Sequence, residues 1–123
     1  MTNYIDGFVL PIPKDRLDEY RRVVSAVANI WLEHGALAYR EFIGDDLSLE
    51  GTRSFTDMVD AGETDAVIFG WIEFASREAR ELANAKVAAD PRMPGLVGET
   101  DTGFDATTMA WGGFRPLLDP ASA

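Results

Sequence analysis

The sequence predicts an α+β fold in a single domain spanning residues 1–123, and three observations lead to this prediction. The chain has the length of one domain with one hydrophobic core. Two segments carry apolar residues at helical spacing, and four others are rich in β-branched and aromatic residues. These segments follow one another as β-α-β and then again as β-α-β, an order typical of small α+β domains.

The first β-α pair is predicted within the first third of the chain. A strand is expected from Tyr4 to Leu10, where the first of two prolines, Pro11, ends it. Asp15 is the expected N-cap of the helix that follows. Apolar side chains then recur at helical spacing, at Leu17, Tyr20, Val24, Val27, Ala28 and Trp31. The helix is expected to end at His34, because Gly35 can adopt the left-handed conformation found after helix C-termini.

The next elements include the most apolar strand of the chain. A strand is predicted over Leu37–Ile43, and a single helical turn is one interpretation of Ser54–Val59. Ala66–Phe74 is apolar on both faces, which is typical of a central strand that is covered on both sides. Ser76 is the expected N-cap of a second helix, which presents an apolar stripe of Ala79, Leu82, Ala83 and Val87. Asp90 should end this helix, because it precedes a proline.

The remaining segments are a loop, a last strand and an acidic stretch. Pro91–Asp105 is predicted to be a loop. Thr108–Leu117 is predicted to be the last strand, and Pro116 favours a position at the edge of the sheet. Asp45–Asp65 holds seven acidic residues and one basic residue, a composition typical of a solvated loop.

The order of the elements predicts a ferredoxin-like βαββαβ domain. Its two helices cover one face of a four-stranded antiparallel sheet. Because the strands are apolar on both faces, the second face also needs a cover, and another copy of the chain is the simplest candidate. We therefore expect a homodimer in which two sheets stack face to face as a dimeric α+β barrel.

Composition excludes several classes of partner and chemistry. The net charge of −10 disfavours binding of nucleic acids, whose phosphates are neutralised by lysine and arginine. The sequence has no apolar stretch long enough for a membrane helix and no secretion signal. Without cysteine and with one histidine, no metal site or cofactor motif is predicted. These observations favour a protein of the cytoplasm.

Several short blocks, taken in order along the chain, resemble the YbaA-like family of bacterial proteins. They are Tyr4–Val9, Pro13-Lys14, Glu33–Leu37, Phe69–Glu73, Asn84–Val87, Asp90–Met93 and Gly112–Phe114. The family is classed as a domain of unknown function within the dimeric α+β-barrel superfamily. The resemblance implies the fold, dimerisation and a bacterial cytoplasmic origin, and it implies no activity.

His34 is the first candidate catalytic residue, because its side chain alone has an unperturbed pKa near neutrality. It could act as a general base at the mouth of the barrel, oriented by Glu33 or by a carboxylate on a strand. The alternative, which we favour, is a cation at a helix C-terminus.

Charged residues within the strands are the second set of candidates. Asp6, Glu73 and Arg115, with Arg40 or Glu41, interrupt apolar segments. If Asp6, Glu73 and one arginine face the barrel interior, they form a polar spot in an apolar cavity, as small-molecule sites do. The alternative, which we favour, is a salt bridge in the core or at the dimer interface.

The candidate ligand-binding residues are Tyr4, Trp71, Trp111 and Arg115. One function hypothesis is a homodimeric barrel that binds a small apolar or aromatic molecule, with or without catalysis. The alternative is a non-catalytic accessory or stress-related homodimer whose barrel is filled by its own side chains. A pocket of about 300 Å³ in the barrel interior that touches Asp6, Glu73, Trp71 or His34 would separate the two hypotheses, because the catalytic hypothesis fails without it.

Overall fold

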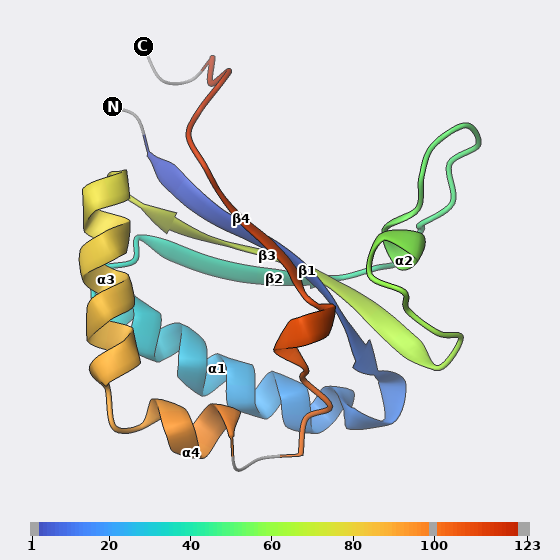
Figure 1. The fold of residues 1–123 in the computed structure, drawn as a ribbon, viewed down its shortest axis with the longest axis horizontal. Helices are drawn as coiled ribbons and strands as arrows, with labels where there is room; N and C mark the ends of the chain where they lie inside the picture. Colours follow the sequence, from blue (N-terminus) through green and yellow to red (C-terminus); the bar gives the residue numbers. More distant parts are fainter. Residues whose placement is uncertain (1–2, 99–100, 121–123) are drawn as a thin grey trace.

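A computed structural model, which describes residues 3–98 and 101–120, has a four-stranded antiparallel sheet in the order β2-β3-β1-β4 (Figure 1). The strands are β1 (Tyr4–Pro13), β2 (Ala38–Ile43), β3 (Asp65–Phe74) and β4 (Ala110–Phe114). The central strands β1 and β3 pair along their whole lengths, from Tyr4 opposite Phe74 to Pro13 opposite Asp65. This is the predicted βαββαβ arrangement, and it places β4 at the edge as expected.

Three of the four described α-helices lie on one side of the strands. The four helices are α1 (Leu17–Glu33), α2 (Phe55–Met58), α3 (Arg77–Ala89) and α4 (Met93–Val97). Figure 1 shows α1, α3 and α4 together on one side, with α2 and its flanking loops on the other. We call the side with three helices the helix face of the sheet and the opposite side the outer face.

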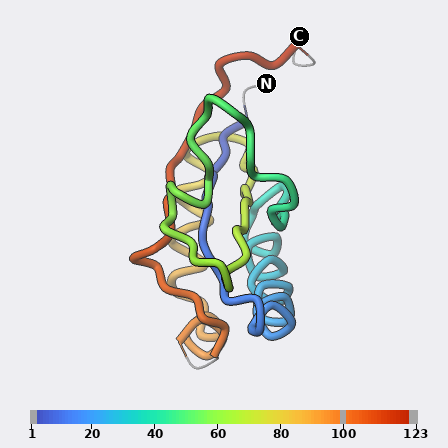
Figure 2. The backbone as a smooth tube through the Cα atoms, turned by 90° about the vertical axis from the view of Figure 1, so that its right-hand side faces the viewer, coloured from blue at the N-terminus to red at the C-terminus, as the bar shows by residue number. Residues whose placement is uncertain are grey.

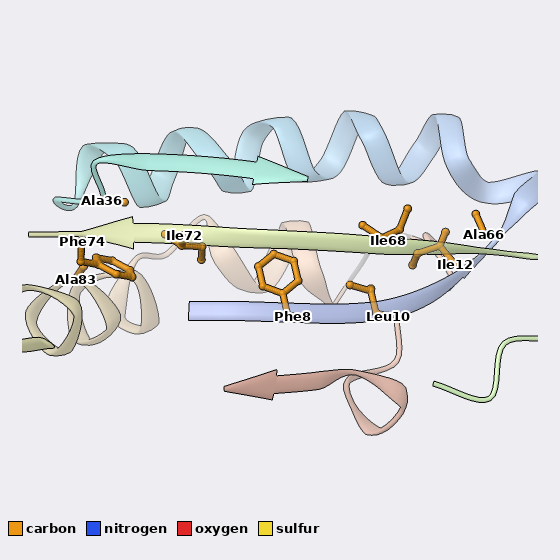
Figure 3. Close-up of a cluster of buried hydrophobic side chains, with 9 residues drawn as sticks. All are labelled: Phe8, Leu10, Ile12, Ala36, Ala66, Ile68, Ile72, Phe74 and Ala83. Atoms are coloured by element: carbon orange, nitrogen blue, oxygen red, sulfur yellow. The ribbon is translucent and has the colours of Figure 1, made fainter. Parts of the chain in front are cut away.

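The main core lies between the sheet and the helices. Alternate residues of β1 and β3 point to the helix face, and the largest of them are buried (Figure 3): Phe8, Leu10, Ile12, Ile68, Ile72 and Phe74. Each such side chain stabilises the fold by roughly 1.5–3 kcal/mol through removal of apolar surface from water. The residues between them in the same strands point to the outer face.

The chain itself covers only one end of the outer face. Val59, which follows α2, is buried against Val9 and Val67. This part of the acidic stretch therefore packs on the sheet, although most of the stretch is exposed and runs in front of the strands in Figure 2. Phe55 of α2 packs edge-on against Phe69, with ring centres 5.9 Å apart, and still leaves Phe69 42% exposed. Phe42 is 51% exposed. The apolar second face predicted from the sequence is present, and most of it has no cover within the described chain.

The N-terminal helix begins later than predicted. The first strand continues through Pro11 to Pro13. Proline is tolerated here because β4 pairs with β1 only as far as Val9, so Pro11 has no neighbouring strand on that side to which a backbone N–H would donate. Asp15 consequently lies in a short 3₁₀ turn, and α1 starts at Leu17 without a side-chain cap. Asp15 as N-cap was therefore wrong. The predicted end was correct, with His34 as C-cap and Gly35 at a φ of 113°.

The predicted apolar stripe of the second helix was also wrong in one position. Ser76 caps α3 as expected, since its hydroxyl accepts a bond from the Ala79 N–H. Leu82, however, is 65% exposed, and the buried residues are Arg80, Ala83 and Val87. Arg80 faces inward because it forms an ion pair with a buried carboxylate of β1, described below.

The C-terminal part of the structure differs from the sequence prediction in two ways. The expected loop after Pro91 contains α4, in which Pro94 occupies an early helical position where the missing N–H is tolerated. The last strand spans only Ala110–Phe114, because its register pairs it with Ile5–Val9 of β1 and Pro116 cannot donate a ladder bond.

An ion-pair cluster connects the end of α1 to the turn between α3 and α4. His34 Nε2 lies 2.9 Å from Asp90 Oδ2, and Asp90 is buried. The Arg92 guanidinium donates to Asp90 at 2.7 Å and to Glu33 at 2.5 Å. Arg92 and then His34 hold the pKa of Asp90 well below its ordinary value of 3.8. The cluster thus joins two helices that lie far apart in the sequence.

This cluster predicts how stability responds to acid. Asp90 is held ionised more strongly in the folded than in the unfolded chain, so its stabilisation is complete above the ordinary pKa of 3.8 and declines below it. We expect Asp90→Asn to lower the free energy of unfolding at neutral pH and to flatten its fall between about pH 5 and pH 2. Urea unfolding across this range measures both effects. Asp57→Asn, at an exposed carboxylate on α2, is the control and should leave the slope unchanged.

The close packing around Gly70 predicts that a larger residue at this position destabilises the fold. Gly70 lies opposite Phe8 in the ladder, and an added Cβ would come within 2.6 Å of the Phe8 ring and 2.8 Å of the Arg40 carbonyl oxygen. Gly70→Ala should destabilise the fold by about 1–3 kcal/mol in denaturant unfolding. Gly62→Ala, whose Cβ meets only an ordinary contact of 3.5 Å, is the matched control. Equal stability of the two variants would contradict the close approach.

Candidate functional site

The candidate site is a cavity of about 300 Å³ between the helix face of the sheet and helices α1 and α4. Its wall is almost entirely apolar and aromatic. The four strands, the helices α1 and α4 and the segment between α4 and β4 line it: Phe8, Leu10, Tyr20, Val23, Val24, Val27, Trp31, Tyr39, Glu41, Ile72, Met93, Leu96, Val97, Thr102, Phe104, Met109 and Trp111. Glu41 is the one charged side chain among them.

A carboxylate held by two phenols is the polar centre of this cavity. The Tyr20 hydroxyl donates to Glu41 Oε1 at 2.5 Å, and the Tyr39 hydroxyl donates to Glu41 Oε2 at 2.7 Å. Tyr39 and Glu41 share the helix face of β2 because they are two residues apart, and Tyr20 reaches them from α1. Each carboxylate oxygen therefore keeps acceptor capacity for a further donor.

The environment of Glu41 changes its acid–base chemistry. Burial raises the pKa of Glu41 above its ordinary value of 4.5, and the two phenol donors oppose this shift. Burial, and then the negative charge of Glu41, raise the pKa values of Tyr20 and Tyr39. Within residues 3–98 and 101–120, no lysine, arginine or histidine forms an ion pair with Glu41. The carboxylate lacks a charge partner, which is costly for a buried ion.

The predicted polar spot of Asp6 and Glu73 does not form. Ile5 is opposite Glu73 and Asp6 is opposite Ile72, so the two carboxylates point to opposite faces of the sheet. Glu73 accepts a hydrogen bond of 2.6 Å from the Asn3 side chain on the outer face. The expectation that the pair shares one site was wrong, because alternate strand residues face opposite ways.

Asp6 instead pairs with Arg80 of α3, a residue that the sequence analysis did not name as its partner. It is 3% exposed and lies 3.7 Å from Arg80 Nε of α3. Burial raises the pKa of Asp6, and the Arg80 charge opposes this shift. The guanidinium also lies 5.1 Å from the centre of the Tyr4 ring and 5.5 Å from that of Trp111. This matches the core salt bridge that we favoured, and charged residues in apolar strands were the signal for it.

The other predicted residues are distributed over four places. His34 belongs to the ion-pair cluster at the end of α1, and it lines neither this cavity nor the other hollow, which is described next. Tyr4 and Arg115 line a second hollow of about 400 Å³ near the start of α3. Trp71 is on the outer face, where it stacks on Phe42 at 5.3 Å. Of the residues predicted to bind a ligand, Trp111 alone lines the main cavity.

The described part of the chain shows neither a metal centre nor a membrane helix. Residues 3–98 and 101–120 contain no group of three or more histidine, cysteine or carboxylate side chains placed to hold a metal ion. Over the same residues, no helix combines the length and the apolar character that a membrane span requires.

Two solved structures resemble this fold. One is a nipsnap family protein of unknown function from Agrobacterium tumefaciens strain C58, with a TM-score of 0.56 and 15% identity over 93% of this chain and 87% of that one. The other is a dimeric ferredoxin-like protein from an uncultured marine organism, with a TM-score of 0.51 and 14% identity over 94% and 95% of the two chains. At these identities the likeness establishes the ferredoxin-like α+β fold.

Sequence comparisons give the family. The family model described as "Protein of unknown function (DUF1428)" matches residues 3–106. The uncharacterised protein YbaA of Escherichia coli strain K12 is 39% identical over 116 residues, which are 94% of this chain and 97% of that protein. YbaA of Shigella flexneri matches with the same values. The chain therefore belongs to the family of YbaA-like proteins of unknown function, DUF1428.

Proposed function

We propose that the protein is a homodimer that binds a small apolar or aromatic molecule in the cavity of each protomer. The observation that carries the proposal is the cavity itself, an apolar space of about 300 Å³ with a single hydrogen-bonded carboxylate in its wall. Small-molecule sites combine these features, namely a concave apolar wall and a few converging polar groups.

The cavity favours ligand binding within each protomer. It is lined by none of the residues of the catalytic hypothesis, namely Asp6, Glu73, Trp71 and His34. A protein whose interior serves only its own stability packs its core with few voids larger than a water molecule. Here Val24 and Val27 of α1 line an open space together with Phe8 and Tyr39 of the sheet. The site lies between the sheet and the helices of one protomer, so the proposal moves it from the predicted barrel interior to the helix face.

The outer face supports the dimer part of the proposal, with a second copy of this chain as the occupant. Phe42, Phe69 and Phe114 are 51%, 42% and 55% exposed there. Phe69 and Phe42 each contact Trp71, with ring centres 6.3 and 5.3 Å apart. Exposed apolar patches of this kind mark association surfaces. A structural neighbour of the chain is itself described as dimeric and ferredoxin-like.

The ligand-binding proposal predicts saturable binding of a neutral hydrophobic probe. N-phenyl-1-naphthylamine should gain fluorescence when it binds, because it moves from water into an apolar cavity. Val27→Trp, which fills the cavity, should weaken its binding about tenfold or more. Leu82→Trp, at an exposed position of α3 outside the cavity, is the matched control. Unchanged binding by a folded Val27→Trp protein, checked by circular dichroism, would place the probe elsewhere.

The dimer proposal predicts a mass of twice the chain mass of 13.5 kDa in light scattering at micromolar concentration. Phe42→Glu should shift the protein to a monomer, because it would bury unpaired charge at the interface. Leu82→Glu also adds a charge at an exposed apolar position, but on the helix side, and should remain dimeric. A monomeric unmodified protein contradicts the proposal, as does a dimeric Phe42→Glu variant.

A further inference from the structure

Glu41 makes the cavity selective for charge as well as for apolarity, and this inference rests on the proposed function. We infer that the ligand class is a small hydrophobic amine in its ammonium form, with its apolar part in the cavity and its positive charge beside the Glu41 carboxylate. Three separate features of the molecule lead to this class of ligand: an uncompensated charge, aromatic walls and the field of the whole chain.

The first feature is the uncompensated charge. Two neutral phenols hydrogen-bond to Glu41, and no cation of the described chain lies within ion-pair distance of it. Arg40 is adjacent in sequence but points to the outer face, opposite Trp71 in the ladder. Hydrogen bonds from phenols orient the carboxylate and leave its net charge in place. A bound cation would supply the missing partner, whereas a bound anion would add repulsion.

The second feature is the aromatic wall. The rings of Phe8, Trp31, Phe104 and Trp111 line the same cavity as Glu41. The faces of such rings attract ammonium and guanidinium ions. The protein already uses this interaction at Arg80, whose guanidinium lies 5.1 Å from the centre of the Tyr4 ring and 5.5 Å from that of Trp111. The ring and carboxylate together form the combination that recognises an organic cation.

The third feature is the overall charge. At −10 the chain repels anions and attracts cations towards its surface. The cavity volume of about 300 Å³ is at the lower end of the range for small-molecule sites, which suits a small aromatic or alkyl ligand. An arylalkylamine meets the requirements of size, charge and apolarity.

Three ligands of nearly equal shape test the charge selectivity by isothermal titration calorimetry at pH 7. They are 2-phenylethylamine, neutral 2-phenylethanol and anionic phenylacetate. We expect the amine to bind about tenfold or more tightly than the alcohol, and phenylacetate to bind more weakly than either. In Glu41→Gln the affinity for the amine should fall to that for the alcohol. Glu73→Gln, which removes a carboxylate from the opposite face of the sheet, should retain the preference for the amine.

The outcomes separate this inference from the proposed function. If the amine and the alcohol bind the unmodified protein equally, the cation selectivity is overturned while binding in the cavity stands. If the neutral probe and all three ligands fail to bind, the proposed function fails as well. Because the comparison in the unmodified protein needs no variant, the test does not depend on the folding of Glu41→Gln. A preference for the amine that Glu41→Gln retains would overturn the assignment to Glu41.

Discussion

The central strands β1 and β3 carry apolar side chains on both faces, and this constraint organises the rest of the molecule. The helix face is covered by α1, α3 and α4, which bury Phe8, Ile72 and Phe74. The outer face is covered by its own chain at one end, where Val59 packs on Val9 and Val67 and Phe55 packs on Phe69. An antiparallel sheet normally has one solvated face that is polar. Here neither face is polar, which is why a second copy of the chain is the cover that we propose.

The same layered arrangement creates the cavity. Helices α1 and α4 cover the helix face without filling it, and the chain around Phe104 and Met109 also lines the space between them and the sheet. The polar groups that point inward have two different roles. Asp6 has Arg80 as a buried partner, so its charge is balanced within the protein. Among the described residues Glu41 is held by the Tyr20 and Tyr39 hydroxyls without a cation, which is why we propose a ligand that balances its charge.

Local patterns in the sequence predicted the fold but not the site. The helix end at His34-Gly35 and the Ser76 cap are set by neighbours within a few residues, and both were correct. Strand alternation also separated the two faces, but it did not indicate which face the helices cover. Glu41 was therefore recognised only as one of several charged strand residues, without its partner Tyr20, which is 21 residues away. The inward position of Arg80 likewise depends on a contact with Asp6 across the fold, whereas helical periodicity favoured Leu82.

The most direct test of the central claim, that an ammonium ion binds beside Glu41, is the pKa of this side chain measured by ¹³C NMR of its carboxyl carbon. Without ligand, we predict a pKa above the ordinary value of 4.5, because burial disfavours the charged form. With 2-phenylethylamine bound, the pKa should fall, because an adjacent cation favours the carboxylate. A pKa of Glu41 that stays unchanged when the amine saturates the protein would contradict the claim.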